Sequence, residues 1–296
     1  MKYNEVIYVF FQKESQTAGM CAFLRAHHLR INAFPIFDDP MCRALPEELY
    51  LQIYDAITQN KGFFTGDHLT TEAVINRYLA GEVVARTAFH HHRLRTAVQL
   101  GARQVVQLGA GLDFTGYGQG TLPRPVGIFE VDRAPVLGQK AALLAQMPPA
   151  YPVVSVAGDV TGEDWANCLV SAGFNPWRRA YFSMFGLSQY LDRTAFDRVV
   201  RYVSLLAAPG STLALDWDRP APHTRALAGA AGAPMAHTVK LDQVIDSLRR
   251  HGFLIYEQME RQQVPDTYLL RYNEIYPEKP LCLPGEPVFI LAVRQE

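Results

Sequence analysis

One segment limits the folds open to this chain more than any other: the apolar run 104–108 leads directly into Gly109-Ala110-Gly111. A strand that ends in closely spaced glycines lets the backbone approach a ligand that side chains would otherwise block. Four further apolar runs of strand length follow at 126–131, 152–156, 180–183 and 211–216. Because helical patterns separate these runs, the sequence predicts a parallel sheet covered by helices on both faces.

Two of the intervening helices have recognisable apolar stripes and ends. The first stripe runs over 196–206, after the capping candidates Asp192 and Thr194, and Pro209-Gly210 ends it. The second runs over 241–248 and is closed by Gly252.

The two ends of the chain read differently from its middle. Residues 1–95 show helical patterns broken by prolines, with one weak strand candidate at 6–11. Beyond residue 253 the sequence predicts two strands, near 253–258 and 288–293, joined by a long polar loop. Such a terminal hairpin would close the sheet with one antiparallel strand.

Charge and cysteine content exclude several functional classes. The formal net charge of -1 supplies no overall attraction for nucleic acid or anionic lipid. Four scattered cysteines without a C-x-x-C pair suggest neither a zinc site nor a disulfide framework. The first residues do not resemble a signal peptide, and no run approaches the roughly 18 apolar residues of a membrane span. We therefore expect a soluble cytoplasmic protein; its oligomeric state is not indicated.

The glycine turn is not a complete dinucleotide fingerprint. The third glycine of G-x-G-x-x-G would fall at position 114, which is Phe114. Without it the following helix is not arranged to cradle a pyrophosphate. The turn suits a ligand such as S-adenosylmethionine, which has no phosphate, although an ordinary strand-to-helix turn is the alternative.

Two acidic positions give the glycine turn a context. Glu130 ends the second predicted strand, 19 residues beyond Gly111, where a carboxylate can accept both hydroxyls of a ribose. Asp159-Val160 follows the third strand, where an Asp side chain and the next N–H can read an adenine edge. Either acid alone is more often a surface carboxylate or helix cap. Their positions at consecutive strand ends favour a cofactor site.

The run His90-His91-His92 invites a metal-site interpretation. Consecutive residues on a helix point about 100° apart, so they cannot share one ion. No metal site is therefore predicted.

Several short motifs, in order and with their spacing, resemble one family. They are Leu24-Arg25-Ala26, Asp39-Pro40, Ala85-Arg86-Thr87, Leu108-Gly109-Ala110-Gly111-Leu112-Asp113, Phe129-Glu130-Val131-Asp132, Asp164-Trp165, Ala172-Gly173-Phe174-Asn175-Pro176, Gly186-Leu187 and Tyr190-Leu191. The chain resembles the leucine carboxyl methyltransferases, particularly the bacterial branch that includes small-molecule O-methyltransferases of secondary metabolism.

This resemblance implies the Rossmann-like α/β fold of the class I methyltransferases. That fold is a seven-stranded, mostly parallel sheet with a C-terminal antiparallel hairpin and an N-terminal helical cap. Residues 1–95 would form the cap over S-adenosylmethionine, and 96–296 the α/β core that binds it, in one integrated domain.

The resemblance also implies roles for single residues. Arg86 matches an arginine that contacts the methionine carboxylate of the cofactor, with a helical ion pair to Glu82 as the alternative. Arg25 and Ser183 would lie near the cofactor as well. The remaining expected cofactor contacts are Gly109, Ala110 and Gly111 in the turn, Glu130 and Val131 at the ribose, and Asp159 and Val160 at the adenine.

At two positions this sequence departs from the family. Phe185 stands where the family usually has a Glu before Gly-Leu, and His90-His91-His92 replaces an acidic residue after Arg-Thr. These changes predict a pocket that is less acidic and more aromatic. Tyr181, Phe182 and Phe185 are candidates to face the sulfonium, where cation–π attraction is worth roughly 0.5–2 kcal/mol.

The predicted function is methyl transfer to a small molecule, most readily to the oxygen of a carboxylate or hydroxyl. A carboxylate acceptor needs no base, whereas a phenol or amine does. The residues do not select a base among His90, His91, His92, His223 and His237.

One alternative is intramolecular chemistry that converts S-adenosylmethionine to azetidine-2-carboxylate and methylthioadenosine. The attacking amine must then be neutral, and a Glu at position 185 would oppose this. A cofactor-binding protein without catalysis and a nicotinamide enzyme also remain open.

Overall fold

A computed structural model describes residues 16–39, 44–64, 68–118, 122–230, 233–236 and 238–296, so the strand candidate at 6–11 lies outside the described residues. The predicted seven-stranded, mostly parallel sheet is confirmed, with strand order β3-β2-β1-β4-β5-β7-β6. β7 is antiparallel to both of its neighbours. The strands are β1 Gln104–Leu108, β2 Gly127–Asp132, β3 Val153–Ala157, β4 Ala180–Met184, β5 Thr212–Trp217, β6 Phe253–Met259 and β7 Val288–Arg294.

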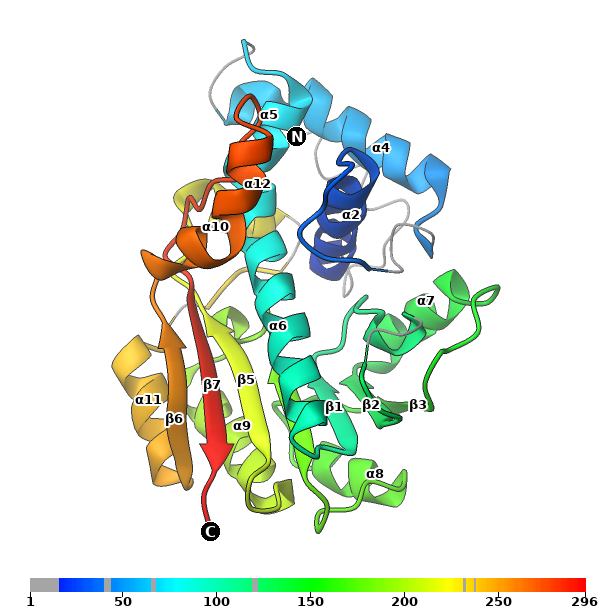
Figure 1. The fold of residues 1–296 in the computed structure, drawn as a ribbon, viewed down its shortest axis with the longest axis vertical. Helices are drawn as coiled ribbons and strands as arrows, with labels where there is room; N and C mark the ends of the chain where they lie inside the picture. The colour runs from blue at the N-terminus through cyan, green and yellow to red at the C-terminus, as the bar shows by residue number, and fades with distance from the viewer. Residues whose placement is uncertain (1–15, 40–43, 65–67, 119–121, 231–232, 237) are drawn as a thin grey trace.

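Helices cover both faces of this sheet, because successive strand residues point to opposite sides. In β1, Val105 packs into the core beneath α6, whereas Val106 packs into the core beneath α8, α9 and α11. Figure 1 shows these two layers. The helices of the core are α6 Gly81–Gln99, α7 Ala134–Leu143, α8 Trp165–Ser171, α9 Arg193–Leu206, α10 Pro222–Ala230 and α11 Leu241–Arg250.

The predicted start of α9 and the predicted end of α11 are confirmed. The Asp192 side chain accepts the Ala195 N–H at 2.8 Å and caps α9. Gly252 follows α11 with a φ of 79°, a conformation that an L side chain rarely adopts.

Among the residues described up to position 95, the chain forms helices and their connecting loops and no strand. They lie beyond the carboxyl ends of the parallel strands, which is the upper end of the sheet in Figure 1. α6 starts among them and runs without a break through residue 95 to contact β4, β5 and β7. These helices are α2 Gln16–Arg30, α4 Glu47–Gln59 and α5 Thr71–Ile75, the last joined to α6 by a π-helical turn, Asn76–Ala80.

The predicted polar loop between the last two strands is partly helical, which corrects that expectation. A π-helical turn, Pro265–Leu269, continues into α12, Leu270–Ile275. Leu269 and Tyr272 are buried, and the helix is too short for an apolar stripe to be visible in the sequence. The loop that follows packs closely against the start of α6. The contact requires glycine at position 81, because a Cβ there would overlap the Cys282 carbonyl.

Candidate cofactor and active site

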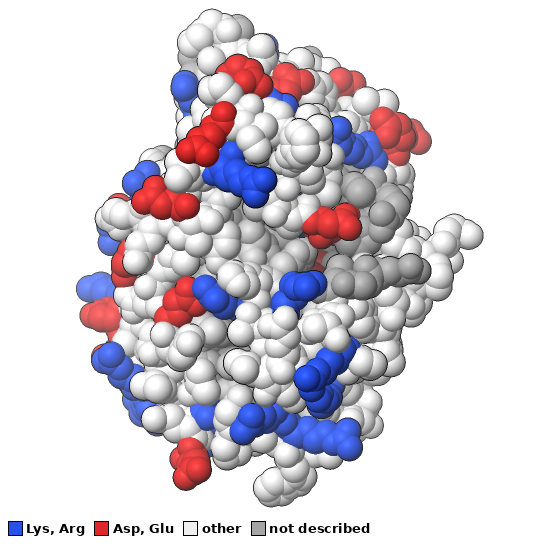
Figure 2. Space-filling view, in the orientation of Figure 1, with Lys and Arg blue, Asp and Glu red and all other residues white. Residues whose placement is uncertain are grey.

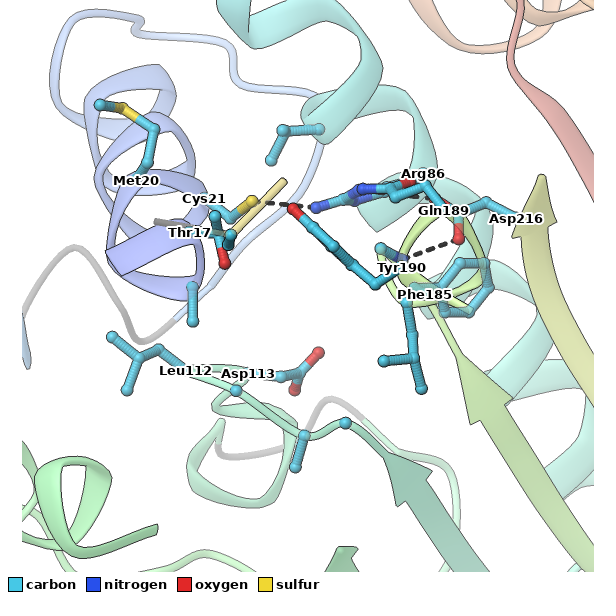
Figure 3. A pocket seen from close by; sticks show the side chains of 18 of the residues that line it. Thr17, Met20, Cys21, Arg86, Leu112, Asp113, Phe185, Gln189, Tyr190 and Asp216 are labelled. Atoms are coloured by element: carbon cyan, nitrogen blue, oxygen red, sulfur yellow. Dashed lines mark hydrogen bonds and ion pairs between the residues drawn. The ribbon is translucent and has the colours of Figure 1, made fainter. Parts of the chain in front are cut away.

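A pocket of about 700 Å³ opens at the carboxyl ends of β1 to β5, between the sheet and the helices α2 and α6. This is the edge at which open α/β sheets bind ligands. Figure 3 shows side chains entering it from α2, from α6 and from the turns after β1 and β4. Of the expected cofactor residues, the pocket is lined by Arg25, Arg86, Gly109, Ala110, Gly111, Asp159, Val160 and Ser183.

The turn after β1 forms the floor of the pocket. Gly109 and Gly111 have φ values of 67° and 50°, which favour glycine at both positions. The Gly109 N–H donates to the Val131 carbonyl at 2.9 Å, so β2 holds the turn in place. Val131 thus contributes its backbone, while its side chain is fully buried in the core.

The two carboxylates of β2 have different surroundings, and this corrects the assignment of Glu130 as a pocket residue. Glu130 is 1% exposed and pairs with Lys140 of α7 at 2.9 Å, outside the pocket lining. Asp132, the last residue of β2, lines the pocket and accepts the Gly111 N–H at 2.7 Å. The strand extends one residue beyond its predicted end, so Asp132 is the carboxylate at the sheet edge.

The turn after β3 places Asp159 and Val160 on the pocket wall. Asp159 Oδ1 accepts the backbone N–H and the hydroxyl of Thr161, at 2.8 and 2.7 Å. These two bonds fix the Asp159 carboxylate beside the cavity, and Val160 is buried next to it.

Arg86 reaches the pocket from α6 and is not held by a helical ion pair. Its Nη1 lies 3.4 Å from Asp216 Oδ2, and its Nη2 donates to Cys21 Sγ at 3.0 Å, as Figure 3 shows. Gly186, with a φ of 65°, makes room for the guanidinium, because a Cβ there would stand 2.9 Å from Nη1. Asp216 Oδ1 also accepts the Gly186 N–H, so strand β5, α6 and the turn after β4 meet at this point.

Arg25 lines the same pocket, but other groups hold its guanidinium. Nε donates to Asp39 at 2.7 Å, and Nη2 donates to the Leu112 carbonyl of the glycine turn. Arg25 therefore ties α2 to the turn after β1.

The three aromatic candidates in and just after β4 do not share one environment. Phe185 lines the pocket and packs edge-on against His90, with ring centroids 5.2 Å apart. Tyr181 and Phe182 are fully buried outside the pocket lining, which corrects the expectation that they face the ligand. Alternation along the strand places them in the two opposite cores.

The histidine run diverges, as the helix geometry requires. His90 lines the pocket; its Nε2 lies 3.7 Å from Asp113 Oδ2 and its Nδ1 is 3.0 Å from the Tyr181 hydroxyl. Burial lowers the pKa of His90 to about 4, so the ring is neutral at pH 7. His91 instead packs against Phe37, and His92 is exposed. Among the residues that the structure describes, no group of three or more His, Cys, Asp or Glu side chains is arranged to hold a metal ion.

Burial opposes ionisation of Asp113, which also lines the pocket. His90, Arg25 and Lys140 nevertheless hold the pKa of Asp113 well below its usual range. Figure 3 shows its carboxylate projecting from the glycine turn.

Two of the carboxylates around Arg86, Asp216 and Asp218, follow the fifth predicted strand, from which they could line the acceptor pocket or be ordinary polar loop residues; the place of Glu82 at the pocket was missed. Glu82, Asp216 and Asp218 all line the pocket, and Trp217, whose Nε1 donates to the Val239 carbonyl at 2.8 Å, lies between the last two. One signal was available, because Glu82, Arg86 and His90 are spaced four residues apart and so share one face of α6.

Comparison with known proteins identifies relatives over most of the chain. The model of the leucine carboxyl methyltransferase family matches residues 18–204. A "Putative S-adenosyl-L-methionine-dependent methyltransferase" of Mycobacterium tuberculosis (strain ATCC 25618 / H37Rv) is 33% identical over 204 residues, covering 67% of this chain. The chain spans 56% of the length of that relative. One of the same description from Mycolicibacterium gilvum (strain PYR-GCK) is 31% identical over 269 residues, covering 84% of this chain and 81% of its own.

The fold has a counterpart among solved structures. A structure described as a putative methyltransferase from Thermobifida fusca YX superposes with a TM-score of 0.54 at 22% identity. The alignment covers 82% of this chain and 93% of that one.

Proposed function

This chain belongs to the leucine carboxyl methyltransferase family, and we propose that it binds S-adenosylmethionine and transfers the methyl group to a small molecule. The observation that carries the proposal is the arrangement of Arg86, the glycine turn and Asp132 around one pocket. The acceptor atom that we favour is oxygen, in a carboxylate or hydroxyl, in a reaction of secondary metabolism.

The residues present fit this cofactor. The Gly109–Gly111 turn is a cradle that side chains would fill: a Cβ on Gly111 would stand 3.3 Å from the Ala18 Cβ. Gln107 Oε1 is buried at the pocket without a hydrogen-bond partner in the described part of the chain, and can accept one from a ligand. Arg86 provides two parallel N–H groups for a carboxylate.

In this proposal each group has a separate task. Arg86 would hold the methionine carboxylate, Asp132 the ribose hydroxyls, and Asp159 with the Val160 N–H the adenine edge. The role first expected of Glu130 thus passes to Asp132, the carboxylate that lines the pocket. The cofactor supplies an activated methyl group, so the protein chiefly binds and orients the two reactants.

For a hydroxyl acceptor, the pocket offers one of the candidate histidines as a base. His90 lines the pocket as a neutral ring. His223 does not line the pocket, and its Nε2 lies 3.0 Å from the Tyr78 carbonyl oxygen. His237 lies outside the described residues. A carboxylate acceptor would leave His90 a positioning role beside Phe185.

The surface is compatible with a small-molecule acceptor. Figure 2 shows basic and acidic side chains scattered over the face in view, with large uncharged areas between them. No helix of the described residues is both long and apolar enough to cross a bilayer. Cys21, Cys168 and Cys282 carry free thiols, which supports the cytoplasmic location that we include in the proposal.

The cofactor assignment is tested by a matched pair of substitutions on one strand, Asp132→Asn and Glu130→Gln. Calorimetry should show Asp132→Asn binding S-adenosylmethionine about ten- to a hundredfold more weakly, since a hydrogen bond to a charged group is worth about 1.5–3 kcal/mol. Glu130→Gln should mainly lower stability. Equal effects on affinity, with both variants folded, would contradict the assignment.

The reaction class is tested by the product formed from the cofactor. S-adenosylhomocysteine that appears only with an added acceptor supports methyl transfer. Methylthioadenosine with azetidine-2-carboxylate, formed from S-adenosylmethionine alone above the non-enzymatic rate, would replace methyl transfer by cyclisation. Phe185→Glu should suppress that cyclisation, because a nearby carboxylate keeps the amine charged.

A further inference from the structure

Two carboxyl groups meet at the end of the pocket remote from the glycine turn. Glu82 Oε1 accepts the Gly285 N–H at 2.6 Å. That oxygen and Asp218 Oδ1 both lie within 3.0 Å of the point where a Cβ on Gly285 would stand. The two carboxyl groups therefore lie side by side, and we refer to them as the acid pair.

In the acid pair Asp218 is buried and Glu82 is half-buried, and their charge is not balanced. Asp218 is 8% exposed, and no N–H or hydroxyl of the described residues donates to its Oδ1. Arg86 acts on both carboxyl groups but is bonded to Asp216 and Cys21. Three carboxyl groups therefore surround one guanidinium.

The surroundings of the acid pair also favour its protonated form. Burial, with Glu82 and Asp216 adding to it, raises the pKa of Asp218 to about 8, although Arg86 and the Glu286 N–H oppose the rise. Burial also raises the pKa of Glu82. At neutral pH the pair therefore holds a proton that a bound cation would displace.

Along α6, the acid pair lies on the far side of Arg86 from the glycine turn. Glu82, Arg86 and His90 follow one face of α6, and two helical turns span about 11–12 Å. His90 adjoins Asp113 of the glycine turn, whereas Glu82 lies two helical turns away, at the other end of this face of α6. Apolar side chains complete the pocket: Leu79, Val83, Leu227, Met235 and Phe289.

We propose that the Glu82–Asp218 pair binds a positively charged amine of the acceptor, so that the substrate is a largely apolar molecule with one cationic group. This inference rests on the proposed function, because it assigns the remote part of the pocket to the acceptor. The apolar walls bury the body of the acceptor, and the acid pair fixes its orientation relative to the reacting atom. The amine is a recognition group and keeps its charge.

The proposal is tested with matched triples of probes that differ in one group. Tyramine, tyrosol and 4-hydroxyphenylacetate form one triple; hexylamine, hexanol and hexanoate form another. Binding to the protein saturated with S-adenosylhomocysteine is measured by calorimetry near neutral pH. We expect an amine to bind at least about tenfold more tightly than its matched alcohol and acid. No amine preference in either triple, including no binding at all, would overturn the proposal.

Substitutions assign that preference to the acid pair. Asp218→Asn and Glu82→Gln should each reduce it about tenfold or more, with little change for the alcohols. Glu286→Gln is the matched control, because Glu286 is an exposed neighbour that pairs with Arg219 at 3.1 Å outside the pocket. A preference retained in both pocket variants would also overturn the proposal.

A proton count distinguishes binding of a cation at the acid pair from burial of the apolar body alone. Repeating the titration in buffers of different ionisation enthalpy should show release of up to one proton on amine binding, absent in Asp218→Asn. If Asp218→Asn weakens S-adenosylhomocysteine as much as the amines, the cofactor's own ammonium occupies the pair and the proposal is wrong. Failure of the unsubstituted protein to bind S-adenosylhomocysteine would instead refute the proposed function.

Discussion

The carboxylates near two strands of the sheet, β2 and β5, have different surroundings. Beside β2, Glu130 faces Lys140, and both side chains are at most 2% exposed. Lys140 also donates to the Asp113 carbonyl and lies 5.5 Å from the Phe114 ring. At β5, Asp216, Asp218 and Glu82 share the single guanidinium of Arg86.

The difference indicates what each group is for. A buried ion pair without access to the pocket can only hold elements together, here α7, β2 and the turn after β1. Uncompensated carboxyl groups are expensive to bury, and such groups cluster where a ligand completes the charge balance. Breaking the first group should cost stability, whereas changing the second should cost binding and improve stability.

The largest effect is expected for Lys140→Met. It leaves the Glu130 carboxylate buried without its partner, so the free energy of unfolding should fall by about 3–5 kcal/mol in urea titrations. The double variant Glu130→Gln/Lys140→Met should recover part of this loss. A loss below about 1 kcal/mol would remove the contrast between the two groups.

A smaller effect, on binding, is expected for Arg86→Lys. Lysine keeps the charge beside Asp216 but cannot present two parallel N–H groups, so S-adenosylmethionine affinity should fall about tenfold. Arg93→Lys is the matched control, because Arg93 lies on the same helix and pairs with Glu257 away from the pocket. Equal affinities in the two variants would argue against a carboxylate contact at Arg86.

A stability effect of opposite sign is expected for Asp218→Asn in the absence of ligand. The folded pKa of Asp218 lies above its unfolded value of about 4, so the folded state binds more protons between these values. The stability that protonation gives is present below about pH 4 and is lost as pH rises through about 8. At alkaline pH the free energy of unfolding of the variant should therefore exceed that of the parent by about 1 kcal/mol or more, and thermal unfolding should show a higher midpoint. In acid the gain should be small.

A matched comparison is available on the surface. Burial opposes ionisation of Asp197, but Ser247, His251 and Arg250 outweigh it and lower its pKa. Its folded pKa lies below the unfolded one, so its contribution is present at neutral pH and lost in acid. Asp197→Asn should thus destabilise slightly, by about 0–1 kcal/mol. A pH dependence of the same sign in both variants would contradict the assignment.

The strands and the glycine turn could be predicted because their signals are local: apolar runs of five or six residues, and glycines at positions that need a positive φ. Asp132, the carboxylate that we propose for the ribose, lies two residues after Glu130, which the sequence pattern favoured. Glu130 and Asp132 both fit the pattern of an acidic residue near the end of the second strand. Only the observed strand register shows that Asp132 lies at the carboxyl end of the sheet. Alternation places Tyr181 and Phe182 on opposite faces of the sheet, whereas Phe185 lies just beyond the end of β4 and reaches the pocket.

The acid pair could not be predicted, because Glu82, Asp218 and Gly285 come from three distant parts of the chain. Their meeting depends on the packing of the last loop against Gly81 and on β7 joining β5. Neither contact leaves a local pattern in the sequence. The sequence alone therefore does not show that Glu82 and Asp218 meet.

The position of Trp217 at the end of β5 makes its fluorescence sensitive to the charges in the pocket. The three tryptophans differ sharply in exposure: Trp165 is fully buried, Trp217 is 8% exposed and Trp177 is 90% exposed. Only the last should be quenched readily by iodide. Because Trp217 joins Asp216 to Asp218 along the backbone, neutralising either carboxyl changes the electric field at its indole. In a Trp177→Phe background the emission spectrum therefore becomes an intrinsic indicator of whether the charged end of the pocket is filled.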